Sequence, residues 1–250
     1  MGRCFEYFAG GNSSEGFFSY SSYIMSQSKA KKIICIKGGP GTGKSTLMKM
    51  AARKYWDTYD VELFHCSSDP DSLDGVVVPQ LGLAIVDGTA PHVIDPIHPA
   101  AVDTIFNAGD FWVEAGIKAH RESIVLLSAA IAEGYRDIYY NLKLVGMIDA
   151  HQNEIEKEMT NASGVDIELE NLRKMMPECQ NGVAASRGIA RKLFINAITP
   201  KGLVDYSKQM AQICQNVYLI KAAKSGAGAR FIAGLDEILR ACEQLGSRTI

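Results

Sequence analysis

The chain has 250 residues, of which 47% are hydrophobic and 22% charged, and its formal net charge is −2. This composition is typical of a soluble globular protein with a sizeable core, built as one large domain or two smaller ones. The near-neutral charge excludes a general electrostatic attraction to nucleic acid or to anionic membranes. No run of about 18 apolar residues is present, so we expect no membrane span.

The six cysteines are scattered along the chain and form no Cys-x-x-Cys pair. Several lie in apolar runs, which is typical of reduced thiols in a cytosolic protein rather than of a disulfide framework. The N-terminus also lacks the apolar segment of a signal peptide. Together these features predict a cytoplasmic location.

The first thirty residues predict a short strand, a turn and a helix. Residues 4–9 have the apolar and aromatic character of a strand, and residues 10–14 are rich in the glycine and serine of turns. A helix is expected from about residue 16 to residue 27. Residues 29–54 then carry eight basic side chains and no acid. Phosphate-site lysines and a solvated helix face explain this charge better than a nucleic-acid groove, so we expect no nucleic-acid partner.

Residues 38–45 (Gly-Gly-Pro-Gly-Thr-Gly-Lys-Ser) match the P-loop, or Walker A, pattern. The apolar residues 33–36 before it predict a buried strand, and residues 46–52 after it predict a helix, which is the context that the motif requires. Glycines let backbone N–H groups turn toward a phosphate at the positive end of that helix. A glycine-rich turn that ends in Lys-Ser by chance is the alternative.

The motif assigns roles to its residues. The loop would hold the phosphates of a nucleoside triphosphate, Lys44 would reach the β- and γ-phosphates, and the Ser45 hydroxyl would bind Mg²⁺. The expected ligands are therefore ATP and Mg²⁺. The residues expected to bind the nucleotide are Gly38, Gly39, Pro40, Gly41, Thr42, Gly43, Lys44, Ser45 and Thr46.

A further strand is expected at residues 61–66, followed by a polar loop at 67–75. Ligands of open α/β sheets bind beyond the carboxyl ends of the strands, so the acids of this loop would lie near the phosphates. Ordinary turn and cap chemistry is an equal alternative. Asp69 is our candidate for a catalytic base, whereas Asp71 and Asp74 are expected to cap a following helix.

Residues 83–87 predict a strand that ends in Asp87, as a Walker B strand does, and the aspartate of that motif holds Mg²⁺. Gly88 follows it in place of the glutamate that serves as base in many ATPases. Another group must then orient the attacking water, or hydrolysis must be slow. The predicted catalytic residues are Lys44, Asp87 and Asp69, and the predicted metal ligands are Ser45 and Asp87.

Residues 100–176 predict a helical arm or lid. Apolar residues recur at steps of three and four from Ile124 to Val145, which is typical of an amphipathic helix. Residues 161–164 interrupt this pattern and Pro177 ends it. Packing of the apolar seam against the second helix is expected, and self-association into a homo-oligomer through the helical region is the alternative.

The end of the chain repeats its beginning. Residues 192–202 match residues 6–16 in pattern, and residues 217–230 match the P-loop segment. In the second copy Gly228-Ala229 or Ala229-Arg230 replaces the lysine and serine of the motif. We therefore expect a degenerate loop that binds no Mg-nucleotide, and one nucleotide per chain.

These motifs together resemble a little-characterised family of bacterial ATPases with tandem P-loop halves. The stretches that carry the resemblance are 8–12, 37–46, 65–69, 71–74 and 87–92. They cover the first hundred residues well and the last sixty loosely. The resemblance implies a P-loop NTPase fold, and it brings no established biological role.

The sequence thus predicts an α/β protein with a three-layer parallel P-loop NTPase sheet, a helical insertion and a degenerate second P-loop repeat. The predicted domains are a nucleotide-binding half at 1–99, an arm or lid at 100–180 and an incomplete repeat at 190–250. We expect ATP binding and Mg²⁺-dependent hydrolysis. A small-molecule kinase that uses the same site, and a nucleotide-dependent interaction module with little turnover, are the alternatives.

Overall fold

The computed structural model describes residues 2–90, 94–159, 161–176, 191–210 and 230–235. The chain forms two compact units. The first comprises residues 1–140 and 192–217, and the second comprises residues 141–191 and 218–250. This division crosses the expected boundaries, because the start of the second repeat belongs to the same unit as the P-loop.

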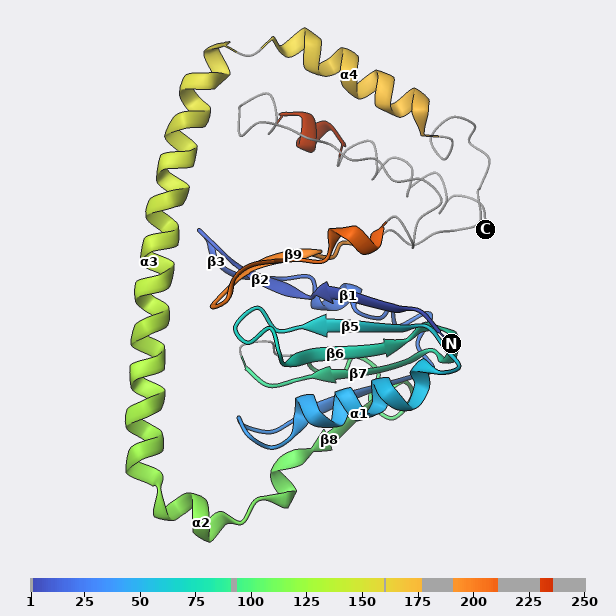
Figure 1. Ribbon diagram of the computed structural model, residues 1–250, viewed down its shortest axis with the longest axis vertical. Helices are drawn as coiled ribbons and strands as arrows, with labels where there is room; N and C mark the ends of the chain where they lie inside the picture. Colours follow the sequence, from blue (N-terminus) through green and yellow to red (C-terminus); the bar gives the residue numbers. More distant parts are fainter. Residues whose placement is uncertain (1, 91–93, 160, 177–190, 211–229, 236–250) are drawn as a thin grey trace. The chain divides into compact units, whose positions relative to one another are not determined.

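A mostly parallel six-stranded sheet forms the centre of the first unit (Figure 1). Its strands lie in the order β1, β5, β6, β7, β4, β8, and β6 runs antiparallel to both of its neighbours. The strands are β1 (Cys4–Phe8), β4 (Lys32–Lys37), β5 (Val61–His65), β6 (Leu73–Val78), β7 (Leu83–Asp87) and β8 (Asp103–Asn107). The strands predicted at 4–9, 33–36, 61–66 and 83–87 are therefore confirmed.

The strand before the P-loop lies beside the strand that ends in Asp87. β4 pairs with β7 in parallel, and Ile36 lies opposite Asp87. On its other side β4 pairs with β8, where Lys37 lies opposite Asn107. The carboxyl ends of three neighbouring strands thus meet at one edge, where open α/β sheets bind ligands.

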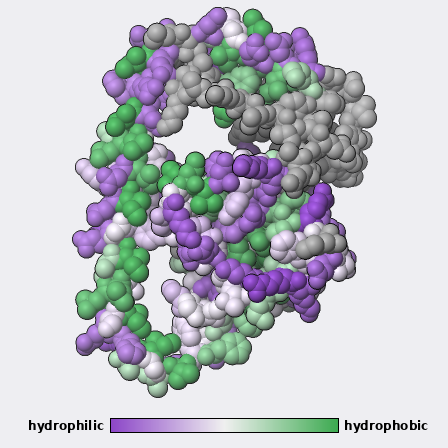
Figure 2. All heavy atoms as spheres, viewed as in Figure 1, coloured by the Kyte–Doolittle hydropathy of each residue, from purple (hydrophilic) through white to green (hydrophobic). Residues whose placement is uncertain are grey.

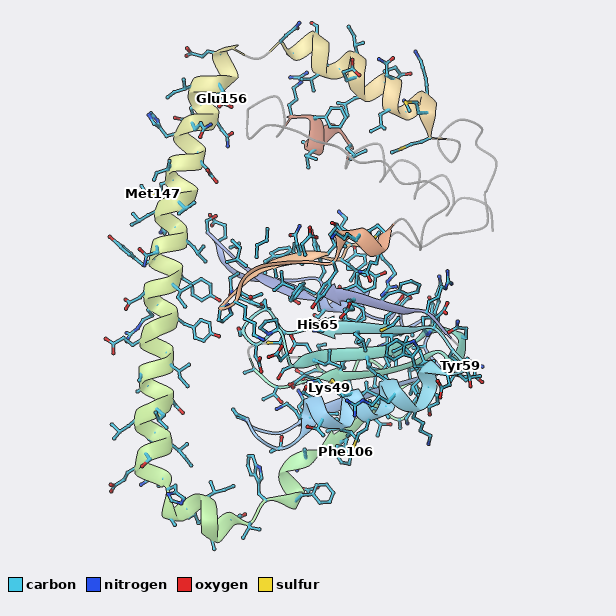
Figure 3. The ribbon with its side chains drawn as sticks, viewed as in Figure 1. Lys49, Tyr59, His65, Phe106, Met147 and Glu156 are labelled. Carbon is cyan, nitrogen blue, oxygen red and sulfur yellow. The ribbon has the colours of Figure 1, made fainter. Side chains whose placement is uncertain are left out.

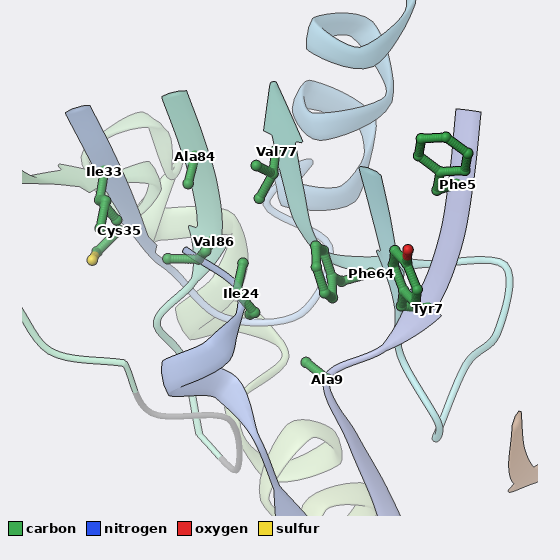
Figure 4. Close-up of a cluster of buried hydrophobic side chains, with 10 residues drawn as sticks. All are labelled: Phe5, Tyr7, Ala9, Ile24, Ile33, Cys35, Phe64, Val77, Ala84 and Val86. Carbon is green, nitrogen blue, oxygen red and sulfur yellow. The ribbon is translucent and has the colours of Figure 1, made fainter. Parts of the chain in front are cut away.

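Helix α1 (Lys44–Trp56) begins directly after the P-loop and packs on β5 and β6. Its buried Met48 joins Ile36 and Val76 in a cluster on this face of the sheet. The other face carries a second cluster, which includes Cys35 and Phe64 (Figure 4). Together the two clusters fix β4 and α1, and therefore the loop between them.

The helix expected at residues 16–27 is wrong. β2 (Gly10–Ser13) and β3 (Gly16–Ser19) form an antiparallel hairpin, and a 3₁₀ turn follows at Ser21–Tyr23. The physical reason is the turn itself. Gly16 has a φ of +103°, which favours glycine, and the Ser13 hydroxyl donates to the Gly16 carbonyl at 2.7 Å.

Two strands of the central sheet, β6 and β8, lie where the sequence indicated none. β6 occupies part of the expected loop 67–75, and all six of its residues are buried. Because a strand follows the loop, Asp71 and Asp74 have no helix to cap, and that prediction is wrong. β8, and the 3₁₀ turn at Ala108–Phe111 after it, begin the region that was expected to be helical throughout.

The rest of that region is helical, as predicted. It contains α2 (Glu114–Ala119), α3 (Arg121–Met159) and α4 (Ala162–Met175). Asn161 lies in the predicted interruption, and its side chain accepts from the Gly164 amide at the start of α4. Large apolar side chains along α3 are exposed, among them Leu126 at 71% and Ile131 at 60% (Figure 2). Among the described residues no helix is long and apolar enough to cross a membrane.

The second repeat forms a hairpin too. β9 (Asn196–Thr199) and β10 (Gly202–Asp205) pair antiparallel, and a 3₁₀ turn follows at Ser207–Gln209. The first part of the repeat therefore has the same local structure in both copies. The second glycine loop, at residues 217–229, lies outside the described residues.

Candidate functional site

The backbone of residues 38–45 forms a glycine-dependent loop at the carboxyl end of β4. Gly41 and Gly43 have φ angles of +79° and +83°, which side chains with a Cβ rarely adopt. The Thr42 hydroxyl donates to the Gly39 carbonyl at 2.8 Å. Thr89, just beyond β7, donates its hydroxyl proton to the Gly38 carbonyl at 2.9 Å. The loop is therefore held both from within and from the neighbouring strand.

Lys44 is folded back into this loop. Its Nζ donates to the carbonyl oxygens of Gly38 at 2.6 Å and Gly39 at 3.0 Å. The same Nζ lies 3.6 Å from Asp87 Oδ2, and both side chains are largely buried. The two predicted catalytic residues from α1 and β7 are thus neighbours, as the parallel pairing of β4 with β7 requires.

Ser45 and Asp87 each accept a hydrogen bond from a backbone amide. The Ser45 hydroxyl oxygen accepts from the Leu73 amide, at the start of β6, at 3.0 Å. Asp87 Oδ1 accepts from the Thr89 amide at 2.8 Å. A hydroxyl and a carboxylate are oxygen ligands that suit Mg²⁺, which keeps several waters and substrate phosphates in such sites. The described residues hold no cluster of three or more His, Cys, Asp or Glu side chains that could bind a metal by themselves.

The structure explains why glycine follows Asp87. A Cβ at Gly88 would lie 2.9 Å from the Ile94 carbonyl oxygen and 3.0 Å from Lys37 Cε. Lys37 occupies this space because its Nζ donates to the Gly88 carbonyl at 2.6 Å and pairs with Asp95 at 2.7 Å. A glutamate at this position would need both neighbours to move, so a base directly after Asp87 does not fit here.

The loop between β5 and β6, residues 66–72, carries the other predicted catalytic carboxylate. Asp69 closes a local turn, since its Oδ2 accepts from the Ser72 hydroxyl at 2.6 Å and its carbonyl accepts from the Ser72 amide at 2.8 Å. This is the turn chemistry that was the alternative for the loop's acids. Asp74, by contrast, is buried in β6 directly after Leu73, whose amide contacts Ser45.

Burial raises the pKa of two cysteine thiols in the first unit. Burial, reinforced by the charge of Asp74, raises the pKa of Cys66 to about 12. Burial and the charge of Glu6 raise the pKa of Cys4 to about 11. A thiol with so high a pKa is almost entirely protonated at neutral pH and is a poor nucleophile.

Several contacts of the site were not expected from the sequence. Thr89, Lys37 and the Leu73 amide bind the P-loop segment or its neighbours, and the Trp112 ring packs against Gly39, where a Cβ would lie 3.1 Å from the ring. The only local signals were the threonine after Asp87-Gly88 and the aromatic pair Phe111-Trp112. Neither indicates which strand its residues adjoin.

Comparison with known proteins does not identify a family for this chain. No family model matches it, and comparisons with curated proteins and with solved structures found no match either. The resemblance to tandem P-loop ATPases therefore stays a prediction from the motifs.

Proposed function

We propose that this chain binds a nucleoside triphosphate with Mg²⁺ at residues 38–46 and that it hydrolyses ATP there. One observation carries the proposal. Lys44 and Ser45, the first residues of α1, follow the glycine loop, and Lys44 Nζ lies 3.6 Å from Asp87 at the end of the neighbouring strand β7. Such an arrangement offers backbone N–H groups, an ammonium and two oxygen ligands to a phosphate chain and its metal ion.

Binding would be an exchange of hydrogen bonds. Lys44 Nζ contacts two loop carbonyls in this structure, and β- and γ-phosphate oxygens would replace them as stronger, charged acceptors. Mg²⁺, when bound, would neutralise phosphate charge. Ser45 and Asp87 are the residues that would hold it. Catalysis would then consist mainly of positioning and charge stabilisation.

The first prediction concerns Lys44. Lys44→Ala should weaken MgATP binding by about 10- to 100-fold, because a hydrogen bond from a charged group contributes about 1.5–3 kcal/mol. Titration calorimetry with MgATP measures this change. Lys54→Ala, an exposed lysine on the same helix, is the matched control and should bind like wild type. Wild-type affinity in a folded Lys44→Ala protein would refute the proposed site.

A kinase is the second candidate, and the lack of room for a side chain at Gly88 favours it. Since no carboxylate fits after Asp87, water activation at that position is absent, and an acceptor hydroxyl could replace water. ADP release measured with and without a panel of acceptor metabolites separates the two reactions. Hydrolysis that no acceptor accelerates supports the ATPase.

The second prediction concerns the base. Asp69 is the candidate from the sequence. Asp74 is buried directly after Leu73, whose amide contacts Ser45, and we propose it as the alternative base. Asp74→Asn should lower kcat by about 10²–10⁴-fold, the contribution typical of a general base. Asp69→Asn is the paired variant and should keep its turnover within about threefold. Steady-state kinetics decide between them, with MgATP affinity as the check that each variant is folded. The reverse ranking would return the role to Asp69.

A further inference from the structure

Two segments of the first unit have the same structure at a constant spacing in the sequence. We call residues 8–23 the first hairpin unit and residues 194–209 the second hairpin unit. Equivalent positions differ by 186 residues (194 minus 8). The strand pairing is identical. Gly10 faces Ser19 in the first hairpin unit, and Asn196 faces Asp205 in the second hairpin unit.

The details of the two turns match as well. The Ser13 hydroxyl donates to the Gly16 carbonyl at 2.7 Å, and the Thr199 hydroxyl donates to the Gly202 carbonyl at 2.9 Å. Both glycines have positive φ angles, +103° and +91°. A 3₁₀ turn follows each hairpin. The internal repeat therefore extends to single hydrogen bonds.

The two hairpin units bind one another reciprocally. The Phe8 amide donates to the Phe194 carbonyl at 2.8 Å, and the Phe194 amide donates to the Phe8 carbonyl at 3.2 Å. The Phe8 ring stacks on the Tyr206 ring at 5.5 Å, and the Phe194 ring packs on the Tyr20 ring at 5.1 Å. Each contact and its counterpart join equivalent residues, so an approximate two-fold axis relates the units.

The tip of the second hairpin unit breaks this symmetry in charge. Lys201 occupies the turn position that Glu15 occupies in the first hairpin unit. Lys201 Nζ pairs with Asp71 Oδ2 at 2.5 Å, in the loop between β5 and β6. The hydrogen bond and the charge of Lys201 lower the pKa of Asp71. Tyr206 also packs on His65, the last residue of β5 (Figure 3), with ring centroids 5.0 Å apart.

The same loop contacts the nucleotide site from its other side. Lys49 of α1, one turn beyond Ser45, donates to the Asp71 carbonyl (Figure 3). Two residues further along, the Leu73 amide donates to Ser45 Oγ, the oxygen assigned to Mg²⁺. Asp71 thus contacts both segments. Its carboxylate binds Lys201 of the second hairpin unit, and its carbonyl oxygen accepts from Lys49 of α1.

We propose that Lys201 is a positioning residue of the nucleotide site. By holding Asp71, Lys201 keeps residues 66–72 in place and so keeps the Leu73 amide against Ser45. The second repeat, whose own glycine loop lacks the motif's lysine and serine, would then tune Mg²⁺ and phosphate binding in the first. This role in the site rests on the proposed nucleotide function. The ordering of residues 66–72 by the Lys201–Asp71 pair does not.

Hydrogen exchange of the nucleotide-free full chain tests whether Lys201 orders residues 66–72, independently of nucleotide binding. The amides of Cys66, Ser72 and Leu73 are hydrogen-bonded within this region. Lys201→Ala should speed their exchange about three- to tenfold, because loss of a tether lets the loop open more often. Glu15→Ala, the equivalent position of the first hairpin unit, is the matched control and should leave them unchanged. Unchanged exchange in Lys201→Ala overturns the proposal.

Mg²⁺ dependence tests the role in the site. In Lys201→Ala the Mg²⁺ concentration for half-maximal ATP binding should rise about three- to tenfold, and Lys201→Arg should restore it. The Lys201–Asp71 pair is exposed, so about 1 M salt should shrink the difference between wild type and Lys201→Ala. Faster exchange with an unchanged Mg²⁺ requirement would overturn the positioning role. If no variant and no wild-type protein binds nucleotide, the proposed function fails while the hold on the loop stands on the exchange result.

Discussion

Strand β6 and helix α3 are both rich in apolar side chains, yet the molecule uses them differently. All six residues of β6 are buried, because two strands flank it and α1 packs on it. Along α3, side chains such as Leu127 and Ile148 are 64% and 68% exposed. An apolar pattern therefore indicates which element forms, whereas burial depends on neighbours that the pattern does not specify.

The largest expected effect comes from shortening one apolar side chain in the sheet and one on α3. Ile36 is fully buried in β4 next to α1, so Ile36→Ala should lower the free energy of unfolding by about 2–5 kcal/mol. Ile131→Ala on α3 should change it by less than about 0.5 kcal/mol, as is usual for exposed positions. Urea unfolding of both variants at neutral pH measures the two free energies.

Equal losses in the two variants would break the contrast, since they would mean that Ile131 is covered in solution. Sedimentation would then show whether a second copy covers it. The positions Ile124, Ile131, Ile138 and Val145 repeat every seven residues, which is the spacing of a helix–helix seam. A wild-type chain that sediments as one protomer would exclude self-association through α3.

A smaller effect on stability is expected for a buried carboxylate, that of Asp103. Asp103, at the start of β8, is buried and accepts hydrogen bonds from the amides of His98 and Ile97 and from Gln27. Burial alone would raise the pKa of Asp103, but these donors outweigh it and hold the pKa below its usual value. Asp103→Asn should therefore cost about 1–3 kcal/mol of stability at pH 7.

The pH dependence of that loss has a definite sign. A carboxyl with a lowered native pKa contributes its full stability above its unfolded pKa of about 3.9, and loses it as the pH falls through the native value. The stability difference between wild type and Asp103→Asn should thus be constant from pH 7 to about pH 5 and shrink below pH 4. Thermal unfolding across this range measures it, with the exposed Asp57→Asn as control. A difference that grows on acidification would contradict the assignment.

The parts of the site that could be predicted are those with local signals. The apolar run before the P-loop and the strand ending in Asp87 were both recognisable within a few residues, and their strands lie side by side. The convergence of Lys44 with Asp87 then follows from the parallel pairing. Signals of this kind need no knowledge of the rest of the chain.

The missed parts depend on distant residues. β6 reads as loop because Asp74 and Gly75 interrupt its apolar run and Pro79 ends it, and only β5 and β7 on either side complete it. The helix expected at residue 16 failed for the opposite reason, since turn chemistry at Ser13 overrode helical spacing. No local pattern places Lys201 beside Asp71, because the Phe8–Phe194 contact brings these distant segments together.

The reciprocal contact between Phe8 and Phe194 also sets an order on folding during synthesis. Its partners are 186 residues apart, and ribosomes add about 5–20 residues per second, so Phe194 emerges about 10 to 40 s after Phe8. The first hairpin forms from neighbouring residues and needs only microseconds. Until Phe194 and Tyr206 are made, the nascent chain lacks the two rings that pack on Tyr20 and Phe8 in the folded protein.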